Sequence, residues 1–213
     1  MKKRFGRQIT SVFTCLVLLS FMVACSQSPD APGGKPAESS SPAQPVTARF
    51  AFQRTLLQAR TWASDAQLLR IYNVNLREVS SAAGKCGGWS ATFVSAQLKK
   101  ARTYSFSVIH SPGYAHKGVF PERDEPWSGT SGQARPFPYQ ALKVDSDEAY
   151  ATAAKESAAF IKKHPQMAVQ FLLEYTPRYP DPAWRVIWGD TLGSSKYSVF
   201  VDCITGKYLQ TIN

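Results

Sequence analysis

The sequence lacks the short motifs on which several classes of enzyme and metalloprotein depend. Its four cysteines include no Cys-x-x-Cys pair, which excludes a zinc site made of thiolates and a thioredoxin-type centre. There is no Gly-x-Ser-x-Gly motif, no P-loop and no Gly-x-Gly-x-x-Gly motif. Only three histidines occur, and His110 and His116 do not have a recognised metal-ligand spacing. We therefore expect no metal, no cofactor and no catalytic centre.

Acidic residues are few, so the chain is basic. Its formal net charge is +10 and its pI is about 9.6. Four basic residues and no acidic ones lie within residues 1–24, and without this segment the charge falls to +6. The remainder has no dense stripe of lysine and arginine and no RNP-like pattern. We expect mild attraction to anionic surfaces, such as lipid headgroups or acidic glycans, and no binding of nucleic acid.

The chain has one long apolar run, residues 12–23, preceded by a basic segment. The run is shorter than the roughly 20 apolar residues that cross a bilayer, so residues 1–24 are predicted to be a signal peptide. It ends in Met22-Val23-Ala24-Cys25, which resembles the lipobox of bacterial lipoproteins. This resemblance implies that Cys25 carries a diacylglycerol with palmitate-type chains and becomes the mature N-terminus. The alternative is an ordinary signal peptide followed by a chance cysteine.

A lipid would provide the membrane attachment, because no apolar segment after Cys25 is long enough to span a bilayer. Each buried methylene contributes about 0.8 kcal/mol, so several acyl chains hold a protein almost permanently. Ser26, and not an aspartate, follows the cysteine. In a Gram-negative cell the resemblance therefore implies the outer membrane, with the protein facing the periplasm.

Residues 25–46 are predicted to be a lipidated, disordered tether. From residue 26 the segment has no aromatic side chain and is dominated by proline, serine, glycine and alanine. Such a composition cannot bury enough surface to offset the entropy of ordering it. A coil of this length has a root-mean-square reach of roughly 25 Å. The folded part should therefore search a volume near the membrane.

The rest of the chain is predicted to be an α+β fold of two halves, residues 47–140 and 141–213. Periodicity and capping residues predict helices over 47–63 and from Asp145 to His164. Alternation predicts strands at 67–73, 89–95, 103–110, 169–175, 184–188, 197–203 and 208–212. The acidic residues 122–125 are expected in a loop between prolines. Because each half is too small for a stable core, we expect two helix-plus-antiparallel-sheet units packed into one body.

The second half ends in the stretch Val201-Asp202-Cys203-Ile204-Thr205-Gly206-Lys207-Tyr208-Leu209. This stretch resembles the aliphatic-Asp-Ala-x-Thr-Gly hairpin of the PepSY family, with Cys203 where alanine is common. The resemblance is best over residues 146–212 and degenerate over 47–120. PepSY modules are exported or membrane-attached, and they have been proposed to modulate secreted peptidases. The resemblance therefore implies a non-catalytic binding or regulatory module with a peptide, a peptidase or an envelope polymer as its partner.

Three tryptophans are the largest apolar side chains at strand positions: Trp89, Trp184 and Trp188. Alternation assigns them to one face of the sheet, which favours packing in the core. The functional alternative is an exposed aromatic patch that recognises a peptide or a glycan.

An envelope hydrolase, with a site assembled only in the fold through Cys86, His110 or Glu174, is the second functional hypothesis. His110 is expected on a strand, at the position of Val201 in the second half, as a partly buried side chain. The two cysteines of the folded part, Cys86 and Cys203, do not occupy equivalent positions in the two halves. We therefore predict that they are free thiols.

The lipidation hypothesis has a direct test. Replacing Cys25→Ala removes the thiol that would carry the lipid, so the protein is expected to change its distribution between membrane and soluble fractions. Unchanged fractionation of the variant would contradict a lipid anchor at this residue.

Overall fold

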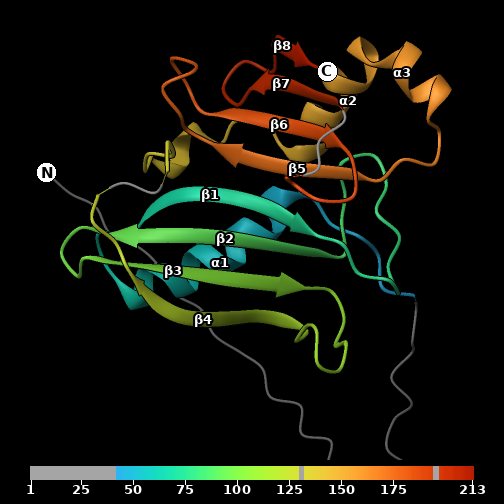
Figure 1. The fold of residues 1–213 in the computed structure, drawn as a ribbon. Helices are drawn as coiled ribbons and strands as arrows, with labels where there is room; N and C mark the ends of the chain where they lie inside the picture. The colour runs from blue at the N-terminus through green and yellow to red at the C-terminus, as the bar shows by residue number, and fades with distance from the viewer. Residues whose placement is uncertain (1–41, 130–131, 194–196) are drawn as a thin grey trace, which may run out of the picture. The chain divides into compact units, whose positions relative to one another are not determined.

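The computed structural model describes residues 42–129, 132–193 and 197–213. Its helices are α1 (Ala48–Trp62), α2 (Ser146–Glu156) and α3 (Ala158–Lys163), with one 3-10 turn, η1 (Tyr139–Ala141). Its strands are β1 (Gln67–Val74), β2 (Gly88–Ser95), β3 (Lys100–Ser107), β4 (Gly118–Pro126), β5 (Val169–Glu174), β6 (Ala183–Trp188), β7 (Tyr197–Asp202) and β8 (Tyr208–Ile212) (Figure 1).

The N-terminal predictions fall mostly on residues that the structure does not describe. The signal peptide, Cys25 and residues 26–41 lie outside the described residues. Val46, which we assigned to the tether, already forms a β-bridge with Cys86 through two backbone hydrogen bonds of 3.0 and 2.9 Å. Val46 therefore belongs to the folded part of the chain, just before α1.

All eight strands join one antiparallel sheet in the order β4-β3-β2-β1-β5-β6-β7-β8. The α+β prediction is confirmed, but the expectation of separate sheets is wrong. Each half has a helical segment, α1 in the first and α2 with α3 in the second, followed by four strands, and the first strand of each half pairs with that of the other. Pairing satisfies backbone groups that two separate sheets would leave exposed at β1 and β5.

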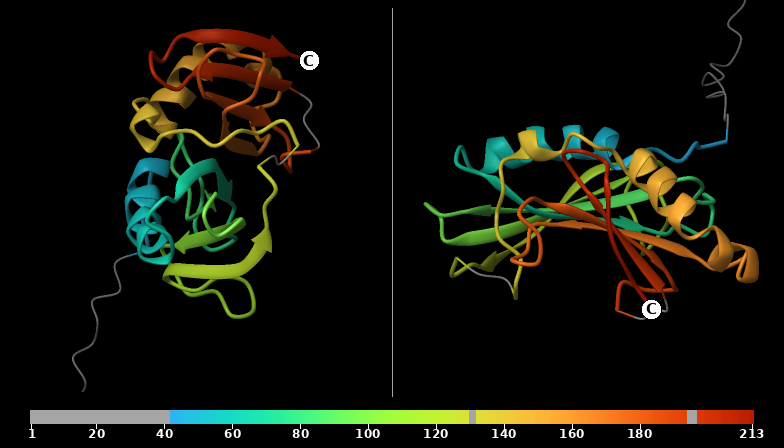
Figure 2. Two further views of the ribbon diagram at one scale, coloured as in Figure 1. Left: turned by 90° about the vertical axis from the view of Figure 1, so that its left-hand side faces the viewer. Right: turned by 90° about the horizontal axis from the view of Figure 1, so that it is seen from above.

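The helices lie on one face of this sheet, as the right-hand view of Figure 2 shows. Helix α1 contacts β1, β2 and β3, while α2 contacts β6, β7 and β8. Each helix turns small residues towards the sheet, among them Ala51 and Ala59 of α1 and Ala149 and Ala153 of α2. The expected second helix is interrupted at Ser157, where the backbone leaves the helical conformation. Within the described residues, no helix has both the length and the apolarity needed to cross a bilayer.

Strand β4 was missed from the sequence, because residues 122–125 were expected in a loop. The strand forms an edge of the sheet, where charged residues and proline are well tolerated. Asp124 accepts hydrogen bonds from Arg102 and, at 3.0 Å, from Lys100 on the neighbouring β3. These cations hold the pKa of Asp124 below its usual value. Cross-strand ion pairing thus stabilises a strand that has little hydrophobic alternation.

The strand register corrects the alignment of His110. Trp89 in β2 lies opposite Phe106, just as Trp184 in β6 lies opposite Val201. Phe106 is therefore the counterpart of Val201. His110 lies beyond the end of β3, because that strand ends at Ser107.

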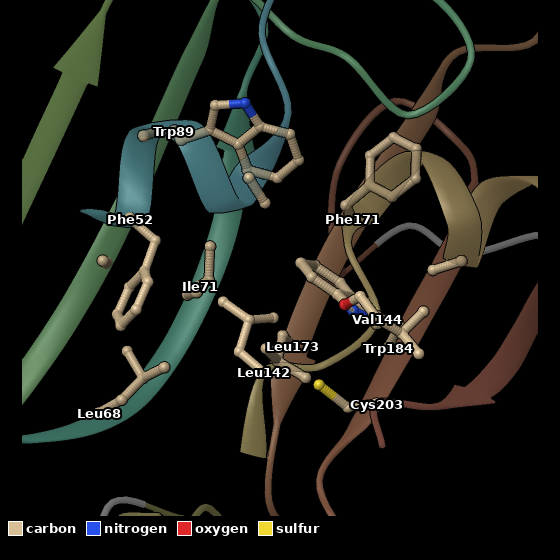
Figure 3. Packing of buried hydrophobic residues seen from close by; sticks show 14 of the residues in the cluster. Phe52, Leu68, Ile71, Trp89, Leu142, Val144, Phe171, Leu173, Trp184 and Cys203 are labelled. Atoms are coloured by element: carbon tan, nitrogen blue, oxygen red, sulfur yellow. Dashed lines mark hydrogen bonds between the residues drawn. The ribbon is translucent and has the colours of Figure 1, made fainter. Parts of the chain in front are cut away.

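The two equivalent tryptophans anchor the two helices in the same way. The Trp89 indole N–H donates to the Val46 carbonyl, and the Trp184 indole N–H donates to the Val144 carbonyl, each at 2.9 Å. Both valines directly precede the N-cap residue of a helix. Figure 3 shows Trp184 beside Val144 in the core. Each buried indole thus satisfies its own donor while fixing the entry of a helix.

The N-termini of α1 and α2 meet at one hydrogen-bonded cluster. Asp145 caps α2 in a capping box with Glu148, and its Oδ1 also accepts from the Arg49 N–H of α1 at 2.9 Å. The Ser146 hydroxyl accepts from the Ala48 N–H at 2.9 Å and donates to the Gly84 carbonyl at 2.6 Å. The first two amides of α1 are therefore satisfied by the cap of α2.

We expect Asp145→Ala to lower the free energy of unfolding by about 2–4 kcal/mol. A helix cap contributes about 1 kcal/mol, and a buried amide left without a partner costs about 1–3 kcal/mol. Urea unfolding of the full chain, followed by tryptophan fluorescence, measures the loss. Thr47→Ala is the matched control, because Thr47 caps α1 alone. Equal losses for the two variants would contradict a role for Asp145 in both helices.

Candidate functional site

The sheet face opposite the helices, here called the open face, carries the candidate site. Alternation in the strands puts Phe171 and Leu173 in the core and Leu172 and Glu174 on the open face. The open face holds polar, charged and apolar side chains, and the segment near Trp127 and Ala134 packs against part of it, where it buries Leu69 and Val94. Hollows occur over both halves of the sheet.

A hollow of about 610 Å³ lies over the second half and is here called the Arg185 hollow. Its walls are β5, β6, β7 and the loop after β5, and it is lined by Gln133, Leu172, Glu174, Thr176, Pro177, Arg178, Tyr179, Ala183, Arg185 and Phe200. A volume of this size is typical of a small-ligand site. The hollow combines apolar walls with two guanidinium groups and one carboxylate.

The arginines of this hollow lie close to aromatic rings. The guanidinium carbon of Arg178 is 5.1 Å from the ring centre of Phe200, and that of Arg185 is 5.8 Å from it. The Tyr179 ring lies 5.4 Å from the Phe200 ring. The Nε of Arg185 donates to the Ser198 hydroxyl at 3.1 Å, which orients the guanidinium. Cation–π contacts of this kind hold a guanidinium without neutralising its charge.

Burial shifts the pKa values of an acidic and a basic side chain in the Arg185 hollow. Desolvation raises the pKa of Glu174 above its usual value, although Arg70 and Arg185 favour its ionised form. Desolvation also lowers the pKa of Arg185, and the like charge of Arg178 adds to this effect. Arg70 lies 3.8 Å from Glu174 across the β1–β5 junction. The carboxylate of Glu174 is therefore engaged by Arg70 as well as facing Arg185.

A second hollow, of about 570 Å³, lies over the first half and has acidic groups in its lining; we call it the Glu122 hollow. It includes Tyr72, Glu122, Glu125 and Trp127. Partial burial raises the pKa of Glu122, and the negative charge of Glu125 raises it further. Arg70 also lines this hollow, but it is paired with Glu174. Apart from this ion pair, the charged groups are arginines in the Arg185 hollow and glutamates in the Glu122 hollow.

The residues proposed for a hydrolase do not come together at one site. Cys86 is fully buried in the core on the helix side, whereas Glu174 faces the open side of the sheet. His110 lies against His116, with ring centres 5.4 Å apart. In the described parts of the chain, no group of three or more histidine, cysteine, aspartate or glutamate side chains is placed to hold a metal ion.

Both cysteines of the folded part are free, as predicted. Burial raises the pKa of Cys86 to about 11 and that of Cys203 to about 12. A thiol with so high a pKa carries almost no thiolate near neutral pH and is a poor nucleophile. The two side chains act as small apolar groups in the core.

The tryptophans singled out in the sequence are core residues. Trp89, Trp184 and Trp188 have exposed fractions of 1%, 0% and 2%. Side chains buried to this degree cannot contact a partner without unfolding the sheet, so the packing alternative accounts for them.

The residues of the Arg185 hollow were missed from the sequence. The available signal was the alternation in β6, where Arg185 lies between Trp184 and Val186 and must face away from them. An arginine in the middle of a strand with buried neighbours on both sides indicates a specific environment. Its partners Arg178 and Phe200 come from other segments, so no local pattern connects them.

No protein-family model matches the chain, and no curated protein matches it. Among solved structures, the chain is similar to the crystal structure of a protein of Clostridium difficile 630 described as a candidate lipoprotein, with 11% sequence identity and a TM-score of 0.47. The similarity covers 82% of this chain and 95% of that one. We transfer no function from this similarity.

We expect Cys86 and Cys203 to resist iodoacetamide at pH 8 in the folded protein and to react in urea. Because their pKa values in the fold lie above the unfolded value of about 8.5, ionisation favours the unfolded chain. Their contribution to stability is thus complete below pH 8.5 and is lost as the pH rises towards 11. Mass spectrometry of the two cysteine peptides measures the reaction. Native alkylation as fast as that in urea would contradict inert, buried thiols.

Proposed function

We propose that this chain is a lipid-anchored binding module of the cell envelope, made of two tandem PepSY-like units, that binds a peptide segment and has no catalytic activity of its own. The single observation that carries the proposal is the open face, where hollows of about 610 and 570 Å³ lie on the one side of the sheet without helices. A sheet surface with hollows over adjacent strands suits an extended ligand.

The equivalence of the halves supports the tandem-unit part of the proposal. Four strands follow a helical segment twice, α1 in the first half and α2 with α3 in the second, and Trp89 and Trp184 make the same hydrogen bond in each half. In the second half, Asp202 Oδ1 accepts from the backbone of Ile204 at 2.9 Å and of Thr205 at 2.7 Å. These contacts give a physical reason for the aspartate of the PepSY-like hairpin, since it holds the turn into β8.

The weak resemblance of the first half to the PepSY hairpin also has a local structural explanation. The register makes Ser107 the counterpart of Asp202, and the Ser107 hydroxyl accepts from the Ile109 N–H at 3.2 Å. Serine therefore makes a shorter version of the same turn contact. The following connection to β4 runs through residues 108–117, which are more numerous than those between β7 and β8. A first unit with a longer connection accounts for the weak sequence match there.

The anchor and the location rest on the sequence. Lipidation of Cys25 would tie the chain to a membrane, and the residues between Cys25 and Val46 would connect the anchor to the folded part. In a Gram-negative cell this places the module at the outer membrane, facing the periplasm. The partner would be a peptide segment, either free or part of a secreted peptidase.

Site-specific photo-crosslinking in native envelopes tests the binding role. A photoreactive phenylalanine analogue is introduced at Leu172 on the open face or, as the matched control, at Leu57, which is 70% exposed on α1. We expect peptide or protein adducts from position 172 and few from position 57. Adducts from position 57 alone, or equal labelling of both positions, would contradict the open face as the binding surface.

A further inference from the structure

The charges of the open face distinguish its two halves. The Arg185 hollow has two arginines in its lining, and its one acidic residue, Glu174, already lies 3.8 Å from Arg70. The Glu122 hollow has Glu122 and Glu125 in its lining, and its one basic residue is the same Arg70 that pairs with Glu174. An anionic ligand would be attracted by the first hollow and repelled by the second.

The geometry of the Arg185 hollow points to a planar anion. Arg178 and Arg185 approach the same ring, Phe200, at 5.1 and 5.8 Å. Their mutual repulsion, which contributes to the lowered pKa of Arg185, is relieved when an anion lies between them. The Nε of Arg185 is occupied by Ser198, and no other side-chain hydrogen bond of Arg185 or Arg178 occurs among the described residues. Guanidinium groups match a carboxylate with two parallel hydrogen bonds.

The walls of the hollow favour a carboxylate on a hydrocarbon stem. Leu172, Phe200 and Tyr179 provide apolar surface beside the two guanidiniums. The Tyr179 hydroxyl donates to the Gln210 amide oxygen at 2.9 Å, so its ring is held against Phe200. A glutamate side chain combines a carboxylate with methylenes that such walls can cover.

We propose that the Arg185 hollow binds an acidic side chain of a peptide, with Arg178 and Arg185 holding the carboxylate and Phe200 and Tyr179 contacting its stem. This proposal rests on the peptide-binding role of the open face and adds its specificity. Glu122 and Glu125 set the orientation of the bound peptide, because their negative charges disfavour a second acidic side chain over the first half of the sheet.

Titration of fluorescent capped peptides against the full chain in a neutral detergent tests this assignment. The probe is Ala-Leu-Glu-Leu-Ala, which has a single acidic side chain, and the comparison peptides carry glutamine or lysine in place of the glutamate. We expect the glutamine peptide to bind at least tenfold more weakly, the lysine peptide more weakly still, and affinity for the probe to fall with rising salt. If the glutamine peptide binds as tightly as the probe, the carboxylate specificity is wrong while peptide binding on the open face stands. If no peptide binds, the proposed function fails as well.

Variants locate the site. Arg178→Gln changes an exposed side chain and leaves the fold intact, so a loss of probe affinity of about fivefold or more is expected; Arg185→Gln should give a larger loss. Arg77→Gln is the matched control, because Arg77 is exposed and lines neither hollow. Equal affinity of the wild-type chain and Arg178→Gln would overturn the proposal. Displacement of the probe by inorganic phosphate but not by acetate would also overturn it, since the hollow would then select a phosphate group.

Discussion

The contact between the two helix N-termini determines the rest of the structure. Two such ends carry partial positive charge and unpaired amides, so they repel each other unless an acceptor lies between them. Asp145 and Ser146 are that acceptor, because they receive the first amides of α1 while capping α2. Gly84 allows the close approach, since a Cβ there would lie 2.4 Å from the Ser146 carbonyl oxygen. Both helices are thereby fixed on one face of the sheet, and the other face has no helix over it.

The sheet itself is joined across a short junction. β1 and β5 share only three residue pairs, from Arg70–Glu174 to Tyr72–Leu172. At one end the Asn73 side chain continues the pairing, since its oxygen accepts from the Phe171 N–H at 2.7 Å. At the other end residues 135–137 bridge to both strands, through Tyr175 and Leu68. The Asn73 side chain and residues 135–137 thus add hydrogen bonds on either side of the short backbone ladder between β1 and β5. The Arg70–Glu174 ion pair lies on this junction.

The sequence predicted the elements better than their assembly. Helix α1 and seven strands follow from periodicity and capping, as for Thr47 and Asp145. β4 was missed because its stability comes from the pairing of Asp124 with β3, which no local pattern reveals. The single sheet depends on long-range contacts of Asn73 and residues 135–137, and the Arg185 hollow depends on side chains from three segments. The sequence left open that Trp89 and Trp184 form an exposed binding patch. Both are instead buried, and each indole fixes the start of a helix.

Residues that lie side by side on three neighbouring strands form a row across the sheet, and equivalent rows of the two halves can be compared. The comparison distinguishes positions that pack the core from positions that differ in chemistry. On the core side, the row Asn73–Trp89–Phe106 corresponds to Leu173–Trp184–Val201, and each retains a tryptophan that holds a helix entry. On the open side, the row Tyr72–Ser90–Ser105 corresponds to Leu172–Arg185–Phe200, and the two rows share no chemistry. Core positions must fill a fixed volume beneath a helix. The open-face positions of these two rows have no helix over them, although Leu69 and Val94 elsewhere on this face are buried beneath the segment near Trp127 and Ala134. The difference in charge between the two hollows therefore arises where packing demands least, which is where a binding specificity can be built without cost to the fold.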